Sequence, residues 1–122
     1  MTRLLAVLLC VGAAASFAAE RVAVVIGANE GAARRAKLWF AERDADRVAR
    51  TFLELGDFHA DQVHVLKQPS VAEVRLALSA AETKLQQSRR EGERAVLVGY
   101  FSGHAASGAR ELGSERCEFS EL

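Results

Sequence analysis

RVAVVIG, residues 21–27, is a short run of mostly β-branched side chains that ends at a glycine. The run does not alternate between apolar and polar residues, which is typical of a strand covered on both faces. Such strands occur in parallel sheets whose two faces both carry helices. The rest of the chain should therefore alternate between further strands and amphipathic helices.

The segment after this strand has the spacing of a helix. Apolar residues recur at steps of four and three, and charged residues hold the opposite stripe. The apolar positions are Ala41, Ala45, Val48, Phe52 and Leu55, and the charged ones are Arg43, Arg47, Arg50 and Glu54. We expect this helix to end at Gly56.

A second strand and a second helix follow. QVHVL, residues 62–66, predicts the strand, and Ser70 with Glu73 forms a capping box that opens the helix. The apolar face of the helix consists of Val71, Val74, Leu78, Ala81 and Leu85. The polar stretch QQSRREGER, residues 86–94, should end it before a third strand over residues 94–101.

This order predicts an α/β fold, a three-layer sandwich of parallel strands joined by right-handed crossovers. With a flavodoxin-like order of second, first, third strand, the loops at 27–37 and 102–109 face each other across a crevice at the carboxyl ends. The tail, with Gly113-Ser114 between two alternating runs, reads as a hairpin. The third strand would keep a raw edge, so we expect the domain to be incomplete.

His104 follows the third strand in the segment YFSGHA, residues 100–105. A loop histidine often only forms local hydrogen bonds, but an imidazole on a loop at the end of a rigid buried strand is suited to acid–base catalysis.

Several segments together resemble the caspase and metacaspase-like cysteine peptidases. YFSGH is similar to their histidine motif, VAVVIGANEG to their first strand and loop, and LWFAERDADRVARTFLELG, in which Asp44-Ala45 would open the first helix, to the following segment. LGSERCEFSEL resembles the hairpin after the histidine. The resemblance implies a caspase-like fold over residues 19–122, as the N-terminal part of a catalytic domain that acts on polypeptides.

The resemblance implies that His104 is the histidine of a Cys–His dyad, in which a thiolate attacks the peptide carbonyl and the imidazole protonates the leaving amine. The family commonly has glycine after the histidine, whose N–H helps to bind the oxyanion, and Ala105 would supply that N–H here. The nucleophile is expected about 50 residues beyond the histidine, but the sequence ends at Leu122. Cys117 follows too closely and fits a hairpin position.

Substrate preference is less clear from the sequence. Arg34 and Arg35, in the crevice loop, could receive an acidic substrate side chain, whereas Glu30 or Asp44 could receive a basic one. The alternatives are a solvated charged loop for the arginines and a helix N-cap for Asp44.

Other chemistries find little support. The segment Gly27–Ala32 lacks the later glycines of a dinucleotide fingerprint, and Ser102 lacks the preceding glycine of a nucleophile elbow. His59 and His64 have no metal ligands at a suitable spacing. We therefore expect no cofactor and no metal.

The first 18 residues have the pattern of a secretory signal peptide. Arg3 precedes an apolar core, and Ser16-Phe17-Ala18 resembles a cleavage site. The apolar run is shorter than the ~20 residues of a spanning helix, so no stable membrane anchor is expected. We expect export to the periplasm or the cell exterior. The formal net charge of zero does not suggest nucleic-acid binding.

Two functions remain open. The first is a secreted caspase-like cysteine endopeptidase, which would need the C-terminal part of the domain to supply the cysteine. The second is a non-catalytic caspase-like or flavodoxin-like binding module.

Overall fold

The computed structural model describes residues 19–106, 109–113 and 115–118, so the expected signal segment lies outside the described residues. Its main sheet contains β1 (Glu20–Gly27), β2 (Val63–Lys67) and β3 (Ala95–Ser102) in the order β2-β1-β3. Both neighbours run parallel to β1. The predicted order and direction of the strands are confirmed.

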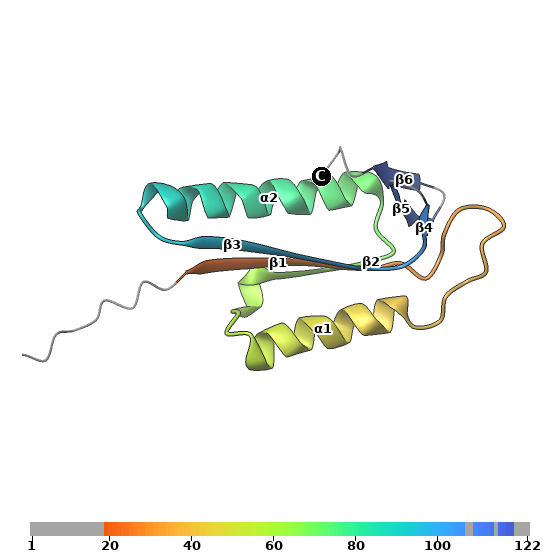
Figure 1. Ribbon diagram of the computed structural model, residues 1–122, viewed down its shortest axis with the longest axis horizontal. Coiled ribbons are helices and arrows are strands. Elements are labelled where there is room, and N and C mark those ends of the chain that lie inside the picture. Colours follow the sequence, from red (N-terminus) through yellow and green to blue (C-terminus); the bar gives the residue numbers. More distant parts are fainter. Residues whose placement is uncertain (1–18, 107–108, 114, 119–122) are drawn as a thin grey trace, which may run out of the picture.

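Two crossover helices cover the two faces of this sheet, α1 (Ala41–Leu55) on one side and α2 (Val71–Arg90) on the other (Figure 1). Ala23 and Val25 of β1 pack with Ala45 of α1. On the other face Val22 and Val24 pack with α2. Each of these buried valines contributes about 1.5–3 kcal/mol relative to an exposed position. The predicted three-layer sandwich is confirmed, with β1 at its centre.

The predicted capping box at the start of α2 is present. The N–H of Glu73 donates to Ser70 Oγ at 3.2 Å, and the N–H of Ser70 donates to Glu73 Oε2 at 2.7 Å. The helix continues to Arg90, so the polar stretch expected to end it forms its last turns. Gln and Arg favour helix, and Arg89 and Arg90 lie where the helix dipole favours cations.

The start of α1 differs from the sequence expectation. Asp44 was expected as the N-cap, but the helix begins at Ala41 after Phe40, and Asp44 lies in its first turn. The N–H of Glu42 instead donates to Asn29 Oδ1 at 3.2 Å. A side chain from the loop after β1 therefore satisfies one of the helix's unpaired amides, and no local cap is used.

A small antiparallel sheet follows β3 at its carboxyl end, with strands β4 (Ala105–Ala106), β5 (Ala109–Leu112) and β6 (Glu115–Glu118) in the order β4-β5-β6 (Figure 1). The hairpin of β5 and β6 was predicted, and Gly113 adopts φ +62° at its turn. The pairing of β4 was not expected.

The sheet has an uncovered edge at β3, which within the described residues pairs only with β1. Val96 and Leu97 are 44% and 47% exposed there. A groove of about 360 Å³ runs between this edge and α2, lined by Leu97, Tyr100 and Phe101 among others. The raw edge expected beside the third strand is thus present in the described part of the fold.

Candidate active site

The loop after β1 and the segment after β3 lie side by side, at the same end of the sheet (Figure 1). Gly27 is the register partner of Ser102, and the N–H of Ala28 donates to the carbonyl of Ser102 at 2.9 Å. His104 therefore follows β3 directly opposite the loop over residues 28–40, which we call the β1–α1 loop. The expected arrangement of the two segments is present.

The imidazole of His104 is half-buried and contacts this loop at two points. Its Nε2 lies 2.8 Å from the carbonyl oxygen of Ala36. Because a carbonyl only accepts hydrogen bonds, Nε2 carries the proton and Nδ1 is the basic nitrogen of the neutral ring. The ring also lies against Gly31, where a Cβ would be 2.6 Å from His104 Cδ2.

The β1–α1 loop is itself held by side chains and backbone from elsewhere. The Gln68 side chain accepts the Glu30 N–H at 2.9 Å and donates to the Glu30 carbonyl at 3.2 Å. The N–H of Gly113 donates to the same carbonyl at 3.0 Å. Within the loop, the Leu38 N–H donates to the Asn29 carbonyl at 2.7 Å. The site thus rests on a loop fixed from both the β2–α2 connection and the hairpin.

Glu111, on β5, has a buried carboxylate that sequence reasoning did not single out. The side chain is 2% exposed. Its Oε2 accepts the N–H of Ala32 at 3.2 Å and lies 3.4 Å from Arg35 Nε, while its Oε1 accepts from Arg35 Nη2 at 3.5 Å. A buried charge is tolerated only when it is paired in this way.

Ala105 lies in β4 and pairs with Arg110 of β5. The preceding residue forms a backbone bond, since the N–H of Glu111 donates to the carbonyl of His104 at 3.0 Å. Hydrogen-bonded and non-hydrogen-bonded pairs alternate along an antiparallel ladder, so the N–H of Ala105 points away from β5. That amide is therefore directed to the outside of the small sheet.

A family model of the caspase domain matches residues 20–120, from the start of β1 past the end of β6. The chain belongs to the caspase domain family. No curated protein and no solved structure matches the chain. The resemblance read from the sequence is confirmed, and the chain is a caspase-like peptidase domain, of a family that acts on polypeptides.

The candidate substrate residues of this caspase-like domain are not gathered at one point. Arg34 is exposed in the β1–α1 loop, with φ +79°. Arg35 pairs with the buried Glu111 and does not lie in a purely solvated loop. Asp44 is on α1 and pairs with Arg47 at 3.6 Å. A substrate role for these residues stays a prediction, and Arg34 is the one that carries no ion pair among the contacts described above.

Cys117 of the caspase-like domain lies in β6, at the register position opposite Arg110. This is the hairpin position expected from the sequence. Among the described residues no cluster of three potential metal ligands occurs, and no helix there has the length and apolar character needed to cross a membrane.

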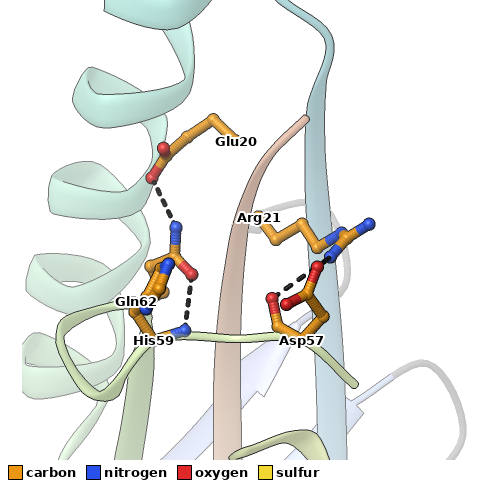
Figure 2. A network of polar contacts seen from close by, with 5 residues as sticks. All are labelled: Glu20, Arg21, Asp57, His59 and Gln62. Atoms are coloured by element: carbon orange, nitrogen blue, oxygen red, sulfur yellow. Dashed lines mark hydrogen bonds and ion pairs between the residues drawn. The ribbon is translucent and has the colours of Figure 1, made fainter. Parts of the chain in front are cut away.

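A separate polar network lies at the opposite, amino ends of the strands (Figure 2). Gln62 donates to Glu20 Oε1 at 3.2 Å and accepts the His59 N–H at 2.8 Å, and Arg21 contacts Asp57 Oδ2 at 2.7 Å. These contacts tie β1 to the segment that leads into β2. His59 is therefore part of a structural network of the caspase-like domain, remote from His104.

Proposed function

We propose that this caspase-like domain belongs to a secreted cysteine endopeptidase and contributes His104 as the histidine of a Cys–His dyad. The nucleophilic cysteine would come from a further segment of the domain, because Cys117 occupies an ordinary hairpin position. The contact between His104 Nε2 and the Ala36 carbonyl, at 2.8 Å, is the observation that carries the proposal.

This contact suits the chemistry because it assigns separate tasks to the two ring nitrogens. Nε2–H anchors the ring to the β1–α1 loop, and Nδ1 keeps the lone pair that accepts the thiol proton. The thiolate attacks the peptide carbonyl, and the resulting imidazolium returns its proton to the leaving amine. Water then hydrolyses the acyl-enzyme. The outward N–H of Ala105 is a donor for the developing oxyanion.

The dyad is tested in a longer chain, in which the reading frame beyond Leu122 supplies a cysteine. His104→Ala is expected to lower kcat by ~10² to 10⁴ and to leave the free energy of unfolding nearly unchanged. His59→Ala is the matched control, since His59 is exposed and lies at the other end of the sheet. A His104→Ala variant that keeps full specific activity would exclude the dyad and favour a non-catalytic binding module.

The 122-residue chain alone should show no turnover of fluorogenic peptides with acidic or basic P1 residues. A base without a nucleophile does not support the acyl-transfer route. Turnover that is abolished by Cys117→Ala would show instead that this chain carries its own nucleophile. Loss only on Ser102→Ala would point to a serine hydrolase.

Export is the part of the proposal that rests on the sequence alone. Residues 1–18 should be removed in a host with a secretory pathway, which leaves Ala19 or Glu20 at the N-terminus. Mass spectrometry of the exported protein measures this directly. A cytoplasmic product that retains Met1 would contradict export.

A further inference from the structure

We propose that Glu111 is a positioning residue for His104, which sets the distance between the imidazole and the Ala36 carbonyl. This inference rests on the proposed function for its catalytic consequence. Its structural core is a contact that Glu111 makes on each side of the imidazole: with the segment that carries the ring, and with the loop to which the ring is bonded.

The first contact is through the backbone. The N–H of Glu111 donates to the carbonyl of His104 at 3.0 Å. This bond belongs to the pairing of β4 and β5, which continues with Ala105 opposite Arg110. The position of the histidine backbone is thereby fixed relative to β5.

The second contact is through the side chain, which holds both ends of one turn in the β1–α1 loop. The N–H of Arg35 donates to the Ala32 carbonyl at 3.0 Å and closes that turn. The Glu111 carboxylate accepts the Ala32 N–H and pairs with the Arg35 guanidinium. Ala36, whose carbonyl binds Nε2, is the next residue along the chain. A shift of the carboxylate would therefore move the carbonyl that anchors the ring.

Gly31 brings the two side chains together. A Cβ at this residue would lie 2.6 Å from His104 Cδ2 and 2.9 Å from Glu111 Oε2. The imidazole and the carboxylate thus occupy the same open side of one glycine.

The chemistry of Glu111 is unusual for a position that serves packing alone. Its neighbours in β5, Ala109 and Leu112, are buried and apolar. An apolar side chain of similar volume generally replaces a buried ion pair at no loss of stability. The carboxylate does something a leucine would not do: it accepts the Ala32 N–H and holds the Arg35 guanidinium. Its role is to determine the conformation of the loop.

The test uses the 122-residue chain and the ring proton of His104. Imidazole ¹⁵N-NMR reports how fast Nε2–H exchanges with water, and the bond to Ala36 should protect this proton. Glu111→Ala, which removes both side-chain contacts, is expected to speed the exchange at least tenfold. Glu111→Gln retains an acceptor for the Ala32 N–H and should keep part of the protection. Arg35→Gln should fall between wild type and Glu111→Ala.

Arg34→Gln is the matched control, because it changes the neighbouring arginine without touching the carboxylate. Backbone amide spectra of β1 and α2 show whether each variant is folded. If Glu111→Ala does not fold, the Gln and Arg35 variants decide. Ring-proton exchange that stays at the wild-type rate in folded Glu111→Gln, Arg35→Gln and Glu111→Ala chains would overturn the inference, even if stability falls.

The kinetic consequence is measured separately in the longer chain that carries a cysteine. Glu111→Gln should lower kcat more than it changes KM, because no substrate contact is removed. Accelerated ring-proton exchange in a chain that no continuation makes active would support the positioning role and refute the peptidase. An active enzyme in which neither exchange nor kcat responds to the Glu111 variants would refute the positioning role alone.

Discussion

The side chain of Gln68 pairs with the backbone of Glu30 through both of its polar atoms, at 2.9 Å and 3.2 Å. One amide group thereby does for the β1–α1 loop what a neighbouring strand does for an edge. Gln68 itself has φ +47°, an uncommon value for a residue other than glycine. The connection after β2 accepts this conformation and, in return, fixes the loop that faces His104.

Replacement of Gln68 by alanine should destabilise the protein by about 1–2 kcal/mol, because two hydrogen bonds are lost. Urea denaturation measures the change. Gln86→Ala on the exposed surface of α2 is the control and should stay within about 0.5 kcal/mol of wild type. Equal effects of the two substitutions would show that the pairing with Glu30 contributes nothing of its own.

Gly31→Ala should displace the imidazole. The new methyl group would be 2.6 Å from His104 Cδ2, and overpacking of this kind typically costs about 1–3 kcal/mol. We expect loss of the protected Nε2–H signal and a lower free energy of unfolding. Gly99→Ala is the control, since a Cβ there meets nothing within 4 Å. An unchanged ring signal in Gly31→Ala would mean that the imidazole does not lie against this glycine.

Lys84 should make stability depend on pH at the amino ends of the strands. Its Nζ contacts Asp61 Oδ2 at 3.0 Å and Glu20 Oε1 at 3.2 Å. The hydrogen bond to Asp61 raises the pKa of Lys84, and the same bond lowers the pKa of Asp61. The Asp61 contribution is complete above the ordinary carboxyl pKa and is lost as pH falls through the lowered one. The Lys84 contribution is complete below the ordinary lysine pKa and is lost as pH rises through the raised one.

Lys84→Met should therefore reduce stability at neutral pH, and its effect should shrink at about pH 3, where the carboxylates become protonated. The midpoint of urea unfolding at the two pH values is the measurement. The same substitution in an Asp61→Asn background isolates the pair. An effect of equal size at both pH values would assign it to packing of the lysine stem.

The exposed edge of β3 predicts self-association of this chain at high concentration. Unpaired strand edges with apolar side chains are templates for pairing with another chain, and Leu97 is 47% exposed. Leu97→Lys should lower the association constant measured by light scattering. Leu76→Lys, at a 73% exposed position on α2, should have no effect. If the two substitutions act alike, association would be a general effect of charge.

The sequence predicted the main sheet and both helices because periodicity reports burial directly. The run at Val22 to Val25 is buried on both faces, and the stripe from Val74 to Leu85 faces β1 and β3. The strand order followed from the same pattern. The pairing of β4 escaped prediction because two alanines carry no alternation.

The site was only partly predictable. His104 stood out by its residue type and its place after a strand. The Ala36 carbonyl could not stand out, because any residue provides one. Glu111 looked like an exposed hairpin residue, since its burial arises only when the β1–α1 loop closes over β5. Arg35 was interpreted as a substrate contact for the same reason: its partner is 76 residues away along the chain.

The register of β1 with β3 joins residues as far apart as Glu20 and Ala95. Closing a loop of this length costs chain entropy before any contact is gained, and distant pairings of this kind slow folding. On the ribosome, β1 would therefore emerge long before its second neighbour and would wait with one side unpaired. The imidazole and its carbonyl would meet only after β3 had joined the sheet, so peptidase geometry could arise only in a chain whose sheet was already assembled.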